Sequence, residues 1–240
     1  MNRGEKPFSI DDGFNLLKLS VRDAEKDNSL RLMVSTYDPV DQMIRDGALF
    51  AWFFHYMPVG MGAAADLLLT PEQRAYMKDR VREIRGLTGG KEIFAIDFQN
   101  DGEFTNGCIA GGKLYCHINA AGDVEPCVFI HYSGANIREK SFLDCLRQPL
   151  FLEYRRGQPF NDNLLRPCPM LENPELLRKM VHETGAHSTD LQSPESVDHL
   201  CDKCKSYAAN WQPTADEIWS HTKIRESRYE NYKDWKPNQQ

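Results

Sequence analysis

The sequence contains no hydrophobic run that approaches the ~20 residues needed to cross a bilayer. Its first residues, MNRGEKPFSIDDGF, lack the apolar centre of a secretory signal. Positive charge is also scarce, since 29 Lys and Arg residues stand against 35 Asp and Glu residues, which gives a formal net charge of −6. Nucleic acids and anionic membranes both require a cationic surface. We therefore expect a cytoplasmic protein that binds neither nucleic acid nor membrane.

Seven cysteines lie in the part of the chain that follows residue 107. A cytoplasmic compartment disfavours disulfides between them. The odd count and the Cys201-x-x-Cys204 spacing indicate either metal or cluster ligands or plain buried thiols. A single cysteine is more often a small core residue than a ligand, and we interpret Cys145, which follows a helical pattern, in that way.

The first hundred residues alternate strand and helix patterns. A Thr-Pro-Glu-Gln sequence from Thr70 predicts a helix start with a capping box. An order of strand, helix and strand is typical of parallel strands joined by a helical crossover. Strands are predicted over 30–34, 49–56 and 93–98, and helices over 39–47 and from Thr70-Pro71 to Gly89-Gly90.

After residue 102 the pattern changes to a hairpin followed by short helices. Two strand patterns, 113–119 and 123–130, flank Ala121-Gly122, which we interpret as a two-residue turn. In that register Cys116 lies directly opposite Cys127, whereas a slip of one residue would place the two side chains on opposite faces. Helices are predicted from Ser141, from Asn173-Pro174 and from Ser193-Pro194, and residues 221–240 as a polar, loosely attached tail.

The cysteines differ in how well their surroundings suit a ligand. Cys127 lies on the hairpin, Cys108 in a glycine-rich loop, and Cys168 in a stiff loop between two prolines. Cys201 and Cys204 are three residues apart and share one helical face. That face also carries Val197 and Leu200, so the alternative that both thiols simply pack in the core stays open; Cys116 is an ambiguous neighbour of Cys127.

Cys108, a spacer and Gly122-x4-Cys127 on a hairpin resemble the start of the SPASM/twitch domain, a cysteine-rich C-terminal extension of many radical S-adenosylmethionine enzymes. Five segments are also similar to a bacterial radical SAM/SPASM family of unassigned substrate, and the resemblance covers roughly residues 45–220. These segments are HYMPVG (55–60), LTPEQR (69–74), DFQNDG (97–102), HINAAGDVEPCVFIHY (117–132) and PCPMLENPE (167–175).

The resemblance implies an α/β fold. Residues 1–102 would form the C-terminal half of a partial (β/α) barrel, residues 103–220 a small α+β domain of twitch/SPASM type with a β-hairpin, and residues 221–240 a polar tail. It also implies one auxiliary [4Fe-4S] cluster that relays an electron or grips a substrate, commonly a peptide. The implied ligands are Cys108, Cys127, Cys168 and one of Cys204 and Cys201.

The chain departs from the family in two respects. Only Cys168 and the Cys201/Cys204 pair follow the hairpin in place of the family's Cys-x2-Cys-x5-Cys-x3-Cys run, which is enough for one cluster and not two. In addition, no Cys-x3-Cys-x2-Cys triplet occurs in its 240 residues. Radical SAM enzymes use that triplet to hold the cluster that cleaves S-adenosylmethionine. We therefore expect no S-adenosylmethionine cleavage by this chain alone, and S-adenosylmethionine would be a cofactor only with a partner that supplies the missing barrel half. Whether the chain is itself an enzyme stays open.

Two other functional interpretations stay open. Four cysteines also suit a structural zinc module that binds a partner protein, and a third possibility is a metal-free protein in which the thiols merely pack. We interpret Asp97 and Asp101 as ordinary loop carboxylates. The zinc-protease-like stretch from His182 to His187 has its second histidine one residue late, and Gly185 ends the helix between them, so we expect no metal site there.

Overall fold

The computed structural model describes residues 38–86 and 90–222. The predicted strand 30–34 and most of the predicted tail lie outside these ranges. Backbone contacts divide the chain into two units: residues 1–51 and 87–94 form unit 1, and residues 52–86 and 95–240 form unit 2. The described residues form helices and three two-stranded sheets, and the partial barrel and its boundary at residue 102 stay predictions.

Helix α3 (Pro39–Arg45) belongs to unit 1 and forms where the sequence predicts a helix. Asp38 caps the helix by accepting a hydrogen bond from the Val40 amide at 3.0 Å, and Pro39 fits the first turn. Lys91 pairs with Asp38 at 2.7 Å and also with Asp41. The negative charges at the helix start are thereby neutralised by a residue fifty positions further along the chain.

Strands β1 (Phe50–Phe53) and β2 (Phe94–Asp97) pair with each other. The Phe94 amide donates to Leu49 and the Phe98 amide to Phe53, so both strands advance in the same direction. A 3-10 helix, η1 (Ala65–Leu67), and helix α4 (Pro71–Ile84) lie between them in the chain. The predicted parallel pair with a helical crossover is therefore confirmed.

Helix α4 has the predicted start but not the predicted end. Thr70 and Gln73 form a reciprocal capping box. The helix stops at Ile84 rather than at Gly89-Gly90, because the Arg85 side chain turns toward the following strand. There its guanidinium donates to the Ala95 carbonyl at 2.6 Å and to Asp101 at 2.8 Å.

Strands β3 (His117–Ile118) and β4 (Val124–Glu125) form the predicted hairpin in a register that differs by one residue from the prediction. His117 lies opposite Glu125 and Ile118 opposite Val124. The Gly122 amide donates to the Asn119 carbonyl at 3.0 Å, and Gly122 has φ +95°. The loop therefore contains three residues and ends on a left-handed glycine, not the predicted two.

The shifted register separates the two cysteines that the two-residue turn would have paired. Continuing the observed register places Tyr115, not Cys116, opposite Cys127, and the Tyr115 hydroxyl donates to Cys127 Sγ at 2.7 Å. Cys116 instead packs in a separate cluster with Cys145. The prediction that Cys116 faces Cys127 is wrong, since one residue of slip reverses every side chain on a strand.

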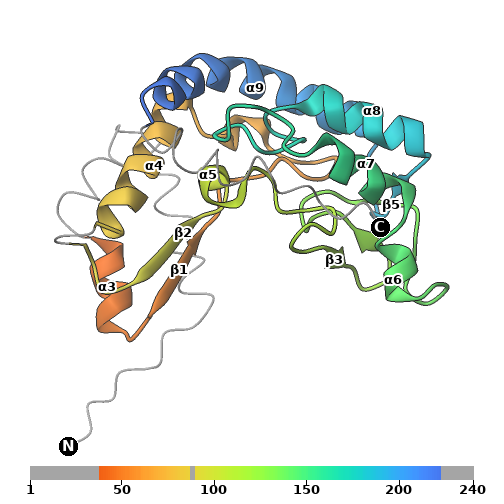
Figure 1. The fold of residues 1–240 in the computed structure, drawn as a ribbon, viewed down its shortest axis with the longest axis horizontal. Coiled ribbons are helices and arrows are strands. Elements are labelled where there is room, and N and C mark those ends of the chain that lie inside the picture. The colour runs from red at the N-terminus through yellow and green to blue at the C-terminus, as the bar shows by residue number, and fades with distance from the viewer. Residues whose placement is uncertain (1–37, 87–89, 223–240) are drawn as a thin grey trace, which may run out of the picture. The chain divides into compact units, whose positions relative to one another are not determined.

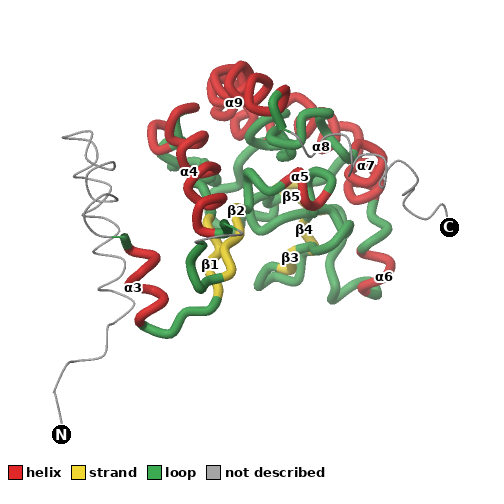
Figure 2. Tube along the Cα trace, turned by 60° about the vertical axis from the view of Figure 1, so that its left-hand side comes forward, coloured by secondary structure: helices red, strands yellow, loops and turns green. Residues whose placement is uncertain are grey.

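A third sheet and the remaining helices complete unit 2. Figure 1 shows α9 running along α8 at one end and reaching α4 at the other, and Figure 2 shows the short strands on the side opposite α9. The sheet joins β5 (Tyr132–Ser133) to β6 (His187–Ser188), and the helices are α5 (Gly102–Thr105), α6 (Phe142–Cys145), α7 (Pro149–Gly157), α8 (Pro174–Thr184) and α9 (Val197–Ser220).

The starts of the late helices follow the predictions with one correction. Helix α6 follows its Ser141 cap, and α8 begins at Pro174 and ends at Gly185 with φ +66°. Helix α9 begins at Val197 with Ser196 as its cap, not at Ser193-Pro194. The reason is a turn in which Asp190 accepts hydrogen bonds from the amides of Gln192 and Ser193.

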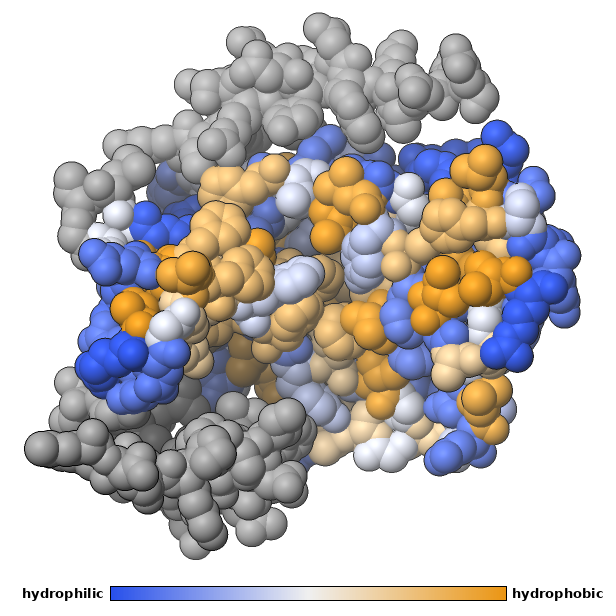
Figure 3. Space-filling model, turned by 90° about the horizontal axis from the view of Figure 1, so that it is seen from below, coloured by the Kyte–Doolittle hydropathy of each residue, from blue (hydrophilic) through white to orange (hydrophobic). Residues whose placement is uncertain are grey.

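Aromatic side chains of β1 and its neighbours in unit 2 reach the surface. Rings of Trp52, Phe54, Phe98 and Phe129 contact one another in series, with centroids 4.8–6.2 Å apart. Trp52 and Phe54 are both nearly half exposed. Figure 3 shows hydrophobic residues at the surface of one face of the molecule. Within the described ranges, no helix is both long and apolar enough to cross a membrane.

The Arg74 side chain is fully buried in unit 2 and uses every N–H of its guanidinium. Nε donates to Asn100, Nη1 to Glu172 and to the Tyr207 hydroxyl, and Nη2 to the carbonyls of Gln99 and Leu165. The guanidinium also lies 4.4 Å from the Trp211 ring. One cation therefore joins α4, the loop after β2, the segment before α8, and α9.

We predict that Arg74→Met lowers the free energy of unfolding by about 3–5 kcal/mol, because it leaves the fully buried Glu172 carboxylate without its partner. Chemical denaturation monitored by circular dichroism measures this loss. Arg80→Met on the same helix removes a more exposed pair with Glu83 and should cost less than about 1 kcal/mol. Equal losses in the two variants would contradict the structural role assigned to Arg74.

Candidate metal centre

The five cysteines predicted as ligands meet in one hydrophobic cluster of unit 2. Cys127, Cys201 and Cys204 are buried members of that cluster, and Cys108 and Cys168 are partly buried and pack against it. They come from four segments: the loop after α5, the end of the hairpin, the loop before α8, and the first turns of α9. The fold therefore gathers thiols that lie far apart in the sequence.

The loop that carries Cys108 is held by two long polar side chains. Lys113 donates to the carbonyls of Thr105, Asn106 and Cys108, and Gln158 donates to those of Cys108 and Ala110. The Ala110 amide points back to Cys108 Sγ at 3.5 Å. Burial raises the pKa of the Cys108 thiol to about 12, the Ala110 amide opposes this rise, and the nearby Cys127 thiol adds to it.

Cys168 sits in a turn whose amides point at its sulfur. The amides of Met170 and Leu171 each donate to Sγ at 3.4 Å. The Cys168 amide donates to Glu172 at 2.7 Å, and Glu172 in turn accepts from Arg74. Burial, the Glu172 charge and the Cys108 thiol all raise the pKa of Cys168. The hydrogen bonds of Arg74 thus hold this turn in place through the Glu172 carboxylate.

Tyr154 of α7 places a hydroxyl among these thiols without a protein partner. The side chain is fully buried, and its oxygen has no hydrogen bond within the described structure. Burial raises the pKa of Tyr154, and the thiols of Cys108, Cys127 and Cys168 raise it further. Tyr154 and Cys127 belong to one hydrophobic cluster, and Cys108 and Cys168 pack against it, so the fold brings the three thiols and this side chain into the same part of the core.

Cys204 and Cys201 face different neighbours on α9. The Cys204 thiol interacts electrostatically with Glu172, which also acts on Cys108 and Cys168. The Cys201 thiol instead interacts with Arg178 and Glu175 of α8. Burial raises the pKa of both thiols to about 12.

The thiols suit an iron–sulfur cluster in ligand type and in the donors around their sulfurs. Within the described ranges, no three side chains of His, Cys, Asp or Glu gather closely enough to hold one metal ion. A tetrahedral zinc with bonds of about 2.3 Å draws its sulfurs to within about 4 Å of one another. A cubane binds one cysteine per iron and accepts thiolates spaced more widely. The N–H···S bonds at Cys108 and Cys168 are of the kind that stabilise such thiolates.

Several residues of this site escape sequence reasoning. Tyr115, Tyr154, Arg74 and Glu172 lack a motif, and the contacts of Arg74 with Glu172 and of Tyr154 with Gly111 join segments far apart in the chain. The PCPMLENPE stretch contains Glu172 but gives no sign that its carboxylate caps the Cys168 turn. The hairpin was predicted, but its predicted register placed Cys116 and not Tyr115 opposite Cys127, so it gave no signal for Tyr115.

The histidines and the aspartates that we expected to play no part in a site differ in their surroundings. His182 of α8 contacts Asp198 at 3.1 Å, whereas His187 lies on β6 opposite Ser133, so the two histidines occupy separate elements. Asp97 is not an ordinary loop carboxylate, since it is buried and lies 3.2 Å from His55. Burial alone would raise the pKa of Asp97, but His55 and Asn100 together lower it. Asp101 is likewise tied to Arg85.

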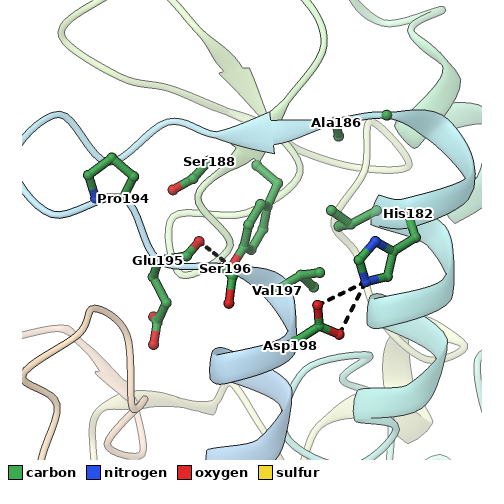
Figure 4. Close-up of a pocket in the computed structure, with 11 residues that line it drawn as sticks. His182, Ala186, Ser188, Pro194, Glu195, Ser196, Val197 and Asp198 are labelled. Carbon is green, nitrogen blue, oxygen red and sulfur yellow. Dashed lines mark hydrogen bonds and ion pairs between the residues drawn. The ribbon is translucent and has the colours of Figure 1, made fainter.

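An open cavity of about 440 Å³ lies where β6 meets the ends of α8 and α9. Figure 4 shows Ser188, Glu195 and Asp198 around it, with His182 held by Asp198. Its lining mixes backbone, small and charged groups and includes none of the predicted ligands. Three of its lining residues, Tyr132, Val181 and Val197, also belong to the hydrophobic cluster that holds the thiols.

Comparison with known proteins gives one match. Residues 108–170 match the SPASM family, described as an iron-sulfur cluster-binding domain. The matched segment begins at Cys108 and contains Cys127 and Cys168. The resemblance noted in the sequence is confirmed for this segment, and it implies iron–sulfur cluster binding. No curated protein and no solved structure matches the chain.

We predict that Gly111→Ala destabilises the Cys108 loop. Gly111 has φ +67°, and an added Cβ would lie 2.5–2.6 Å from the base of the Tyr154 ring. Gly185 has nearly the same φ, +66°, but open space around it, so Gly185→Ala isolates the backbone cost alone. Thermal or chemical unfolding should find Gly111→Ala less stable than Gly185→Ala by about 1–3 kcal/mol. Equal stabilities would show that Tyr154 does not pack tightly on this loop.

Proposed function

We propose that this protein holds one auxiliary [4Fe-4S] cluster on the thiolates of Cys108, Cys127, Cys168 and Cys204, as part of a radical SAM/SPASM-type protein. The observation that carries the proposal is that Cys108, Cys127 and Cys168 meet in one hydrophobic cluster while protein N–H and O–H groups point at their sulfurs. The SPASM match over residues 108–170 supports the nature of the metal centre.

The choice of Cys204 as fourth ligand rests on its neighbours. Cys204 shares the influence of Glu172 with Cys108 and Cys168, and Tyr207, one turn further along α9, bonds Arg74 at 2.8 Å. Cys201 instead interacts electrostatically with Arg178 and Glu175 of α8. We assign Cys201 a packing role in the interface of α8 and α9.

The chain's own contribution is to gather, bury and orient the ligands. The raised pKa values of these thiols mean that the thiols are protonated when no metal is bound. Metal binding must therefore release protons. When bound, the cluster supplies one-electron transfer or a contact for substrate. The substrate we propose is a peptide or protein, and the electron source or radical step comes from a partner that supplies the missing barrel half. The proposed compartment is the cytoplasm.

A structural zinc module is the weaker candidate. Its support is limited to the cysteine count, whereas the SPASM match over residues 108–170 favours an iron–sulfur cluster. Anaerobic purification separates the two: an iron–sulfur protein is brown and bleached by dithionite, and a zinc protein is colourless.

We predict that single Cys→Ser variants at 108, 127, 168 and 204 lose most of their cluster, because each removes one ligand of an iron. Iron and sulfide counts on the anaerobically reconstituted full chain measure the loss, against about four of each per wild-type chain.

Cys201→Ser and Cys145→Ser are matched controls, since both thiols are fully buried in unit 2. Unchanged iron in all four ligand variants would overturn the proposal, and loss in Cys201→Ser rather than Cys204→Ser would reverse the assignment of the fourth ligand.

We predict that the reconstituted chain alone does not cleave S-adenosylmethionine, because it lacks the Cys-x3-Cys-x2-Cys triplet that binds the cleaving cluster in the family it resembles. Incubation with dithionite and S-adenosylmethionine, followed by chromatography for released methionine, measures this. Methionine release that scales with the iron content of the chain would refute the auxiliary role.

A further inference from the structure

The Tyr154 hydroxyl is a buried polar group that neither the fold nor the set of thiol ligands uses. Its side chain is fully buried, and within the described structure its oxygen has no hydrogen-bond partner. A buried hydroxyl without a partner destabilises a folded protein, so native structures supply a partner in nearly every case. The lack of a protein partner therefore bears on which group occupies the space next to the hydroxyl.

The tyrosine ring is held rigidly from two sides. Its base lies against Gly111 in the loop that follows Cys108, so closely that even a methyl group would not fit between them. Its edge meets the Phe160 ring, with centroids 5.3 Å apart and planes at 88°. The position of the hydroxyl is thus set by packing and not by a hydrogen bond of its own.

Tyr154 belongs to the hydrophobic cluster that contains Cys127, and Cys108 and Cys168 pack against that cluster. The thiols of Cys108, Cys127 and Cys168 interact electrostatically with Tyr154. A second tyrosine, Tyr115, already uses its hydroxyl in this region, donating to Cys127 Sγ at 2.7 Å. The chemistry next to Tyr154 therefore favours an acceptor made of anionic sulfur.

We infer that Tyr154 is a positioning residue whose hydroxyl donates a hydrogen bond to a sulfur of the bound cluster and thereby raises its reduction potential. This inference rests on the proposed function. One-electron reduction adds one negative charge to the cluster and its thiolates, and no bond to the protein is made or broken. A donor hydrogen bond stabilises that added charge, and Tyr115 acts in the same sense at Cys127.

The test compares Tyr154→Phe with Tyr132→Phe in the anaerobically reconstituted full chain. Both changes remove one buried tyrosine hydroxyl from the same hydrophobic cluster, but the Tyr132 hydroxyl donates to the Glu195 carbonyl at 3.1 Å. Iron and sulfide are counted first, and the reduction potential is then measured by dithionite titration followed by electron paramagnetic resonance. We expect the one-electron reduction constant of Tyr154→Phe to fall about tenfold, a shift of about 59 mV to lower potential, and that of Tyr132→Phe to stay at the wild-type value.

The melting temperature of the metal-free chains gives a second readout, in which the two variants are expected to shift in opposite directions. Without a cluster, Tyr154→Phe should melt at a higher temperature than wild type, because it removes a polar group that lacks a partner, whereas Tyr132→Phe should melt at a lower temperature. A loaded Tyr154→Phe with the wild-type potential, or an equal shift in Tyr132→Phe, would overturn the inference alone. If Tyr154→Phe loads poorly, a metal-free melting temperature at or below wild type would overturn it. Wild type that takes up no iron would overturn the proposed function first, and the inference with it.

Discussion

The buried Arg74 guanidinium is the interaction on which the arrangement of the metal-binding unit depends. Its N–H groups reach three other segments, the loop after β2, the segment before α8, and α9, and its partner Glu172 accepts both from Arg74 and from the amide of Cys168. A cation and a carboxylate buried together are stable only when their geometry and remaining hydrogen bonds are satisfied, and here every N–H of the guanidinium has an acceptor. The position of the Cys168 turn relative to α4 and α9 is therefore fixed by charge pairing and not by apolar packing alone.

The same core then presents its thiols in an environment that favours the protonated form. Burial raises the pKa of Cys108, Cys168 and Cys204, and the carboxylate of Glu172 acts in the same direction. Donors aimed at the sulfurs act the other way: backbone amides at Cys108 and Cys168, and the Tyr115 hydroxyl at Cys127. When this site binds its metal, the thiols give up their protons and the positive iron ions take the place of those protons. Metal binding and the stability of this unit are therefore coupled.

Local sequence signals predicted the elements well and their mutual placement less well. Thr70, Asn173-Pro174 and Gly185 carry strong capping signals, and α4 and α8 start or end there. The hairpin existed as predicted, but its register depended on whether Gly122 closes a loop of two or three residues, a choice decided by hydrogen bonds between Asn119 and its neighbours. The candidate ligands came from motif and resemblance. The roles of Tyr154 and Glu172 could not be predicted, because they arise from contacts across more than forty residues of chain.

The most direct test of the account is X-ray absorption spectroscopy on the full chain, purified and reconstituted without oxygen. The account predicts an iron edge with sulfur as the nearest shell and iron as the next, since each iron of a cubane is held by one cysteine thiolate and by the sulfides it shares with the other irons. A chain that carries no iron and a single zinc with four sulfurs at about 2.3 Å would contradict it.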